Sequence, residues 1–268
     1  MTAALKQEDI GFQANLYESR NPTRNWLHNE RRDWVDSRLD ALSGTNTTYL
    51  EIGIGCGVYT KKMANTGKVV AVDINESFVL AAALISGVQA EVADICSGPI
   101  AHANADIALC SEVIEHVPDS PAALRNIYLS LRPGGKLILT TPNSFSTTEI
   151  VARLLTFRLV VKFARLVYGE SVDDLGHINR LTRGTLRKQL LIAGFEIIEQ
   201  DNVALYLPAI AEFGGVPGVR FAKWLANIFR KSSVLSHLLW TQCWVVRRPS
   251  PPLDTQSDTN AYLRRKNA

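Results

Sequence analysis

The chain has 268 residues, 46% hydrophobic and 21% charged, a composition that excludes a fibrous or disordered protein and can bury one substantial core. A net charge of +3 is too small to indicate nucleic-acid binding, because attraction to phosphates needs clustered Lys and Arg side chains. The four cysteines lie far apart without a C-x-x-C pair, which favours reduced thiols and a cytoplasmic protein. The sequence shows neither a signal-peptide pattern nor about 18 consecutive apolar residues, so we expect no secretion and no membrane span.

Residues 1–47 are predicted to form a helical cap. Their apolar side chains recur at helical spacing, which is typical of helices that pack over the edge of a sheet or cover a bound ligand. These side chains are Trp26, Leu27, Trp34, Val35, Leu39 and Leu42.

Residues 48–248 are predicted to form one α/β domain. Short apolar runs rich in β-branched residues alternate with helical patterns, which is typical of βαβ units and a mostly parallel sheet with helices on both faces. We expect seven strands, near 48–53, 68–73, 88–92, 105–111, 135–141, 195–201 and 241–246. Helices are expected near 58–65, 76–85, 119–132 and 182–193, the last ended by Gly194.

Three further segments interrupt or follow this pattern. An inserted helical lid is expected at 143–180, where substrate selection would lie, and a second helical insertion at 203–239. The tail at 249–268 is rich in Pro, Ser, Thr, Asp and Asn, which predicts disorder.

Three glycines at alternate positions follow the first predicted strand. Gly53, Gly55 and Gly57 lead directly into a helix, and glycine allows both a tight turn and close approach of a ligand to the backbone. A dinucleotide site needs a glycine where this chain has Val58, which disfavours an NAD-linked oxidoreductase. The loop therefore predicts a nucleoside-sized ligand at the carboxyl edge of the sheet.

An acidic residue followed by G-x-G-x-G resembles the first motif of class I S-adenosylmethionine-dependent methyltransferases, which have a Rossmann-like fold. The resemblance implies that the loop wraps the methionine part of the cofactor, with Glu51 near its cationic end. Asp73 would then bind the ribose hydroxyls and Asp94 the adenine amino group, although either aspartate could instead merely begin a turn. The expected cofactor-binding set is completed by Ile74, Ile95 and Ser111.

The segment from Ser111 to Pro118 and the later Leu131–Lys136 resemble a methyltransferase group that includes ubiquinone-biosynthesis O-methyltransferases and many natural-product methyltransferases. The resemblance covers roughly residues 48–200 and implies S-adenosylhomocysteine as a product. If the segment turns helically, Glu112, Glu115 and His116 point to one side.

Three roles of this acidic and histidine cluster stay open. His116 or His177, supported by Glu115, would serve as a general base for the acceptor. Alternatively, Glu112, Glu115, His116 and His177 would bind Mg²⁺, as the similar segment of plant small-RNA 2′-O-methyltransferases binds a divalent cation. The third role is purely architectural.

The region from Gly214 to Arg248 has six basic and no acidic residues. Its apolar residues Phe221, Trp224, Leu225 and Ile228 recur at helical spacing, which predicts either peripheral contact with an anionic membrane or packing against the sheet or in a homodimer. The sequence thus favours methyl transfer to oxygen, nitrogen or carbon of a small natural-product or lipid-like acceptor, by in-line displacement. The alternative is a catalytically silent protein of the same fold that binds a cofactor or a partner.

Overall fold

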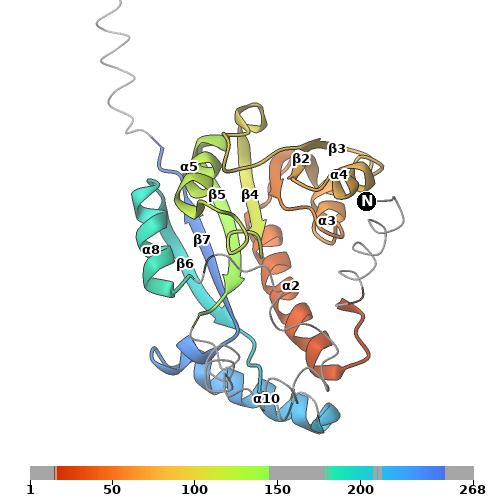
Figure 1. Cartoon of the computed structure of the whole chain (residues 1–268), viewed down its shortest axis with the longest axis vertical. Helices are drawn as coiled ribbons and strands as arrows, with labels where there is room; N and C mark the ends of the chain where they lie inside the picture. Colours follow the sequence, from red (N-terminus) through yellow and green to blue (C-terminus); the bar gives the residue numbers. More distant parts are fainter. Residues whose placement is uncertain are drawn as a thin grey trace, which may run out of the picture.

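The protein forms a seven-stranded sheet covered by helices on both faces (Figure 1). The computed structural model describes residues 15, 17–144, 179, 181–207, 210 and 213–250. The strands are β1 Thr47–Ile52, β2 Gly67–Asp73, β3 Val88–Val92, β4 Ala105–Ser111, β5 Leu131–Pro142, β6 Glu196–Val203 and β7 Thr241–Arg247. The helices are α2 Pro22–Leu42, α3 Thr60–Ala64, α4 Glu76–Ala82, α5 Ser120–Ser130, α8 Arg183–Ile192 and α10 Gly215–Arg230, with 3₁₀ turns η1 Ala101–Ala103 and η2 Leu235–Leu238.

The strand order β3-β2-β1-β4-β5-β7-β6 confirms the predicted mostly parallel α/β sheet. Strands β1 to β5 are paired in parallel, and β7 runs antiparallel to both β5 and β6. The chain leaves β1 toward β2 and later returns to β4 on the other side of β1. The connections that leave the carboxyl ends of β1 and β4 therefore run in opposite directions. Such a topological switch point is where α/β sheets form their ligand-binding crevices.

Alternate residues of the central strands pack on opposite faces, as the pleat requires. Leu50 and Ile52 of β1 join the core made with α5 and α8, whereas Tyr49 joins the core made with α2, α3 and α4. The central strands are buried on both faces, which explains their nearly continuous apolar sequences.

Helix α2 confirms the predicted N-terminal helix. Asn21 caps it by accepting hydrogen bonds from the backbone N–H groups of Thr23 and Arg24 at 2.9 and 3.1 Å, and Pro22 occupies the first turn. Its buried face packs on the sheet through Trp34, Val35 and Leu39, and on α10 and the segment after β6 through Trp26 and Leu27. Because α2 extends along the sheet toward α10, it brings its side chains to the switch point (Figure 1).

Most of the predicted strand boundaries hold within two residues. Strand β5 instead begins at Leu131 rather than near 135, since Leu131 pairs with Ala105 before a bulge shifts the register. Helix α8 ends as predicted, with Gly194 at φ +99°. Helix α10 confirms extra helical structure between β6 and β7.

The predicted lid at 143–180 and tail at 249–268 lie almost wholly outside the described residues, so both stay predictions, as does the division into cap, domain and insertions. The four cysteines are free thiols. Among the helices of the described residues, none combines the length and the apolar character that crossing a bilayer requires.

Candidate functional site

The glycine loop after β1 has a backbone shape that only glycine adopts easily. Gly53, Gly55 and Gly57 have φ angles of +80°, +52° and +72°. A Cβ atom at Gly53 would lie 2.2 Å from Cγ2 of Val113, so no side chain fits there. The loop therefore presents bare backbone at the switch point, which suits close approach of a ligand.

Asp73, at the end of β2, fixes the conformation of this loop. One carboxylate oxygen accepts hydrogen bonds from the backbone N–H groups of Ile54 and Gly55 at 2.8 and 3.4 Å. The other oxygen accepts a hydrogen bond from the N–H of Asn75 at 2.8 Å. Each carboxylate oxygen has two lone-pair sites, and three of the four are occupied, so Asp73 keeps capacity for one ribose hydroxyl while it holds the loop. Sequence reasoning predicted a ligand-binding aspartate and missed its bonds to the loop, which join positions 18 and 19 residues apart.

Glu51 lies beneath the loop rather than on the surface. It is 2% exposed and accepts a 2.6 Å hydrogen bond from the Thr60 hydroxyl of α3. Burial raises the pKa of Glu51 to about 8, and the nearby Asp73 carboxylate adds to this, while the Thr60 hydrogen bond opposes it. Glu51 is therefore mainly protonated at neutral pH, and a cationic ligand beside it would favour the ionised form.

The residues expected around adenine differ in exposure. Asp94, after β3, is exposed and accepts hydrogen bonds from the Cys96 N–H at 2.8 Å and the Ser97 hydroxyl at 3.1 Å, so it forms a turn, and its contact with adenine stays a prediction. Ile95 is buried in the core, whereas Ile74 is 77% exposed next to Asp73. Ile74 is therefore the more accessible of these two apolar side chains at this edge of the sheet.

The segment after β4 is a series of turns, so the condition under which Glu112, Glu115 and His116 would share one side, a helical segment, is not met. Glu112 has φ +56°, in the left-handed region, and its N–H donates to the Thr140 carbonyl at 2.9 Å. Ser111, expected at the cofactor, forms a 2.9 Å hydroxyl contact with Thr140. The helical geometry that would turn Glu112, Glu115 and His116 to one side is therefore absent from this segment.

Glu115 and His116 lie side by side but in different surroundings. Glu115 is 2% exposed, and one of its oxygens accepts a 2.9 Å hydrogen bond from the Thr141 hydroxyl. The other oxygen lies 3.8 Å from Nε2 of His116, whose side chain is 43% exposed. Burial, together with the charge of Glu112, raises the pKa of Glu115 to about 8.

Asn179 fastens this turn to the segment before α8. Its backbone N–H donates to the Glu115 carbonyl at 2.8 Å, and its side-chain amide donates to the Val117 carbonyl at 2.5 Å. His177, predicted as a second base or a metal ligand, lies outside the described residues. Within the part of the chain that the structure describes, no group of three or more His, Cys, Asp or Glu side chains is arranged to hold a metal ion.

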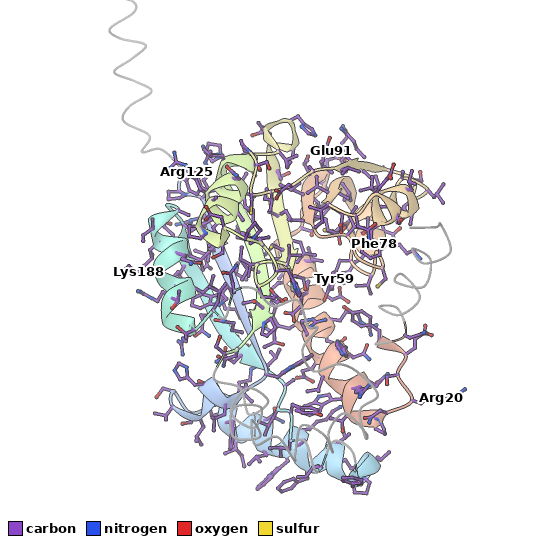
Figure 2. All side chains as sticks on the ribbon, in the orientation of Figure 1. Arg20, Tyr59, Phe78, Glu91, Arg125 and Lys188 are labelled. Carbon is purple, nitrogen blue, oxygen red and sulfur yellow. The ribbon has the colours of Figure 1, made fainter. Side chains whose placement is uncertain are left out.

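Arg31 of α2 is a site residue that the sequence analysis missed. Its guanidinium forms a 2.8 Å ion pair with Glu112, and the two side chains are 8% and 19% exposed. Burial lowers the pKa of Arg31, but the Glu112 carboxylate, together with smaller contributions from Tyr17 and Tyr59, more than offsets this effect, so the pKa is raised and the guanidinium stays charged. Tyr59, at the start of α3, is buried on the same side of the sheet, near the centre of the molecule (Figure 2). No local pattern marks Arg31, because its partner is 81 residues away in the sequence.

Known proteins share both the sequence motifs and the fold of this chain. A family described as "Methyltransferase domain" matches residues 26–200, more than half of the chain, and this range includes most of α2, the glycine loop and the turn after β4. The chain belongs to this methyltransferase family. The class I S-adenosylmethionine-dependent methyltransferase type inferred from the sequence motifs is thus confirmed.

Curated relatives match part of this methyltransferase. It is 33% identical to a ubiquinone biosynthesis O-methyltransferase of Pseudomonas putida (strain F1) over 120 residues, covering 42% of this chain and 50% of the relative. It is 36% identical over 146 residues to the protein of that name from Xanthomonas oryzae pv. oryzae (strain PXO99A), covering 48% and 59%. The match thus spans only half to three fifths of these relatives.

Solved structures show the same fold at low sequence identity. An S-adenosylmethionine-dependent methyltransferase from Mesorhizobium loti gives a TM-score of 0.54 at 17% identity, covering 79% of this chain and 96% of that one. The N-methyltransferase NodS of Bradyrhizobium japonicum WM9, solved with S-adenosyl-L-homocysteine, gives 0.52 at 15% identity, covering 92% and 98%. The [4+2]-cyclase SpnF gives 0.53 at 17% identity, covering 82% and 81%, so the fold alone does not specify the reaction.

Proposed function

We propose that this protein transfers the methyl group of S-adenosylmethionine to oxygen, nitrogen or carbon of a small natural-product or lipid-like acceptor. The observation that carries the proposal is the bare glycine loop, held by Asp73 at the switch point between β1 and β4. The exposed Ile74 and the buried Glu51 flank this loop and suit the nucleoside and the cationic end of that cofactor, respectively. The family match supports the same reaction.

The bound cofactor supplies a methyl group that its sulfonium already makes electrophilic. The protein therefore needs chiefly to align the acceptor with the methyl–sulfur bond and to exclude water. The turn after β4 lies beside the loop, because Val113 contacts Gly53. Acceptor groups held by this turn would thus lie close to the cofactor.

His116 is our candidate for the general base. A neutral imidazole is the commonest general base in proteins, and Nε2 of His116 lies 3.8 Å from a carboxyl oxygen of Glu115, in the turn that neighbours the glycine loop. A hydroxyl or amine acceptor would lose its proton to His116. A pH profile of kcat tests this role: we expect His116→Ala to lower kcat about 100-fold and to remove the acid limb of the profile. A profile that keeps its acid limb without the imidazole would exclude His116 as the base.

Cofactor binding is tested first, by the melting shift that S-adenosylhomocysteine produces. We expect a clear shift for the native protein and for Asp33→Asn, an exposed aspartate of α2, and loss of most of it for Asp73→Asn. No shift in the native protein, or a shift with NADH instead, would contradict the proposed cofactor.

Turnover is tested by formation of S-adenosylhomocysteine in the presence of pooled phenols, amines, sugars and lipid extracts. A product signal that depends on one pool identifies the acceptor class. Binding without turnover in any pool would favour the alternative, a catalytically silent protein of this fold.

We further propose that α10 rests on an anionic lipid surface and that the acceptor is reached from there. Helix α10 fully buries small or short side chains, Val219, Ala222 and Ala226, against α2 and the segment after β6, and Leu225 and Phe229 pack partly buried beside them. Three other large apolar side chains are exposed: Phe221, Trp224 and Ile228 are 46%, 58% and 41% exposed. The helix lies beyond the carboxyl end of β5, at the same end of the sheet as the glycine loop (Figure 1).

Charge supports a lipid partner for this surface. Arg220, Lys223 and Lys231 are exposed among the outward apolar side chains, and residues 214–248 include no acidic residue. Exposed aromatic side chains flanked by cations are typical of helices that lie in the interface of an anionic membrane.

Co-sedimentation with vesicles tests the lipid proposal. We expect the native protein and Leu84→Glu, a control at a still more exposed apolar residue in the turn between α4 and β3, to pellet with phosphatidylglycerol vesicles, and Trp224→Glu to stay in solution. Failure of the native protein to pellet, or a Trp224-dependent dimer on gel filtration, would contradict it.

A further inference from the structure

The ion pair between Arg31 and Glu112 joins two parts of the chain at the turn after β4. Arg31 projects from α2, before the sheet begins, and Glu112 follows β4 directly. The guanidinium is enclosed: it lies 3.4 Å from both the Tyr17 hydroxyl and Nδ1 of His28, and 5.7 Å from the ring of Trp240. The pair is therefore a built-in feature of this edge rather than a mobile surface contact.

The backbone holds the Glu112 carboxylate toward α2. Its left-handed φ of +56° and the hydrogen bond from its N–H to the Thr140 carbonyl set the direction of the side chain. Its second oxygen accepts a 3.1 Å hydrogen bond from the Thr140 hydroxyl. Both oxygens of Glu112 are thus engaged within the chain, whereas the divalent site, one of the three roles that the sequence left open, needs this carboxylate directed at a metal ion together with Glu115, His116 and His177.

A divalent cation does not fit this arrangement. To bind Glu112, a metal ion would have to share the carboxylate with a buried guanidinium or displace that guanidinium from its partner, and both are strongly unfavourable. It would also stand within a few ångströms of a fixed positive charge. The described residues therefore disagree with the metal site that the Glu-x-x-Glu-His resemblance implied.

We propose that the guanidinium of Arg31 is the resident cation of this edge and takes the place of a divalent metal ion at Glu112. The site consequently has a fixed positive charge that neither chelators nor pH remove, because a guanidinium keeps its proton throughout the physiological range. The Nε atom of Arg31 is buried and has no hydrogen-bond partner among the described residues. This leaves one charge-assisted donor available to an oxygen at the turn. The inference concerns the same edge as the proposed methyl transfer, but its test does not require turnover.

Calorimetric titration with MnCl₂ and MgCl₂ tests the proposal on the full chain. We expect no binding heat for the native protein or for Arg31→Lys, which keeps a positive charge. We expect Arg31→Met to bind Mn²⁺ at least about tenfold more tightly than the weakest binding that the titration detects, because Glu112 is then free of its cation. The double variant Arg31→Met with Glu112→Gln should be silent again, which assigns the new site to Glu112.

Two results would overturn the proposal. The first is that the native protein binds Mn²⁺ and that Glu112→Gln weakens this binding. The second is that Arg31→Met is folded by circular dichroism but does not bind Mn²⁺. If Arg31→Met does not fold, electron paramagnetic resonance of Mn²⁺ with the native protein and Arg31→Lys still decides, since bound Mn²⁺ in both would refute a resident guanidinium. A parallel melting shift with S-adenosylhomocysteine separates the two proposals. If S-adenosylhomocysteine does not shift the melting temperature of the native protein, the proposed cofactor is refuted, and the metal titration can still be interpreted.

Discussion

Replacing Glu51 with glutamine should make the protein less sensitive to alkaline pH. The Glu51 carboxyl is 2% exposed, and its only recorded hydrogen bond among the described residues comes from Thr60. Its pKa is raised from 4.5 to about 8 in the folded protein, chiefly by burial. Below pH 4.5 the group is protonated in both states and has no effect. Between 4.5 and 8 the unfolded chain ionises it while the folded chain keeps the proton, so stability falls as the pH rises.

The size of this effect follows from the difference between the two pKa values. Each pKa unit corresponds to about 1.4 kcal/mol, so Glu51 costs about 3 kcal/mol at pH 7 and about 5 kcal/mol above pH 8. A glutamine side chain has nearly the same shape, accepts the same hydrogen bond from Thr60 and cannot ionise. The variant Glu51→Gln should therefore gain stability over the native protein progressively from pH 5 to pH 9.

Urea denaturation followed by circular dichroism at pH 5, 7 and 9 measures this difference. Glu115, whose pKa is raised in the same direction, is present in both proteins and cancels in the comparison. Glu18→Gln, at an exposed carboxylate, is the control and should show no such trend. A constant offset between Glu51→Gln and the native protein would only report a packing change. A difference that does not grow between pH 5 and pH 9 would refute the argument that Glu51 is buried in its protonated form.

Three further substitutions test packing and charge, each by urea denaturation at pH 7. Gly53→Ala should cost more than about 1 kcal/mol and weaken the S-adenosylhomocysteine shift, since φ is +80° and the new Cβ would meet Val113 at 2.2 Å. Glu112→Gln should cost about 3–5 kcal/mol because it leaves buried Arg31 unpaired, and removal of both charges should recover part of this loss. Lys62→Ala should change stability by less than about 0.5 kcal/mol, because its ion pairs with α2 are partly exposed.

The sheet could be predicted from the sequence because its signals are local. Strands β1 and β4 are apolar runs buried on both faces, and the intervening helices have their own periodicity, so their order and type follow from the pattern alone. The start of β5 could not be predicted in the same way. Leu131 joins the sheet through its pairing with Ala105, although Pro133 and Gly134 lie within the strand and locally indicate a turn.

The orientation of α10 illustrates a different limit. Its amphipathic pattern is evident in the sequence, but the pattern does not tell which side packs inward. The structure buries the small residues, because Ala222 and Ala226 let α10 approach Trp26 and Leu27 of α2 closely. The aromatic side chains Phe221 and Trp224 are left outside, with ring centroids 5.8 Å apart. Spacing therefore predicted the helix, and only the contact with α2 decided its exposed face.

The same distinction applies to the acidic residues of the candidate site. Glu51 and Glu112 were both singled out by motif resemblance. The sequence placed Glu51 near the cationic end of the cofactor and offered a divalent cation as one of three open roles for Glu112. The structure gives Glu112 a cationic partner within the chain, whereas Glu51 has none among the described residues and keeps its proton instead. The two carboxyl groups differ because α2, which precedes the motifs in the sequence, brings the guanidinium of Arg31 to Glu112 and none to Glu51. Because the cation at Glu112 is a side chain, the positive charge at this edge of the sheet is fixed when the protein folds. A relative with the same Glu-x-x-Glu-His motif but without an arginine at the position of Arg31 would need an external ion for the same electrostatic balance.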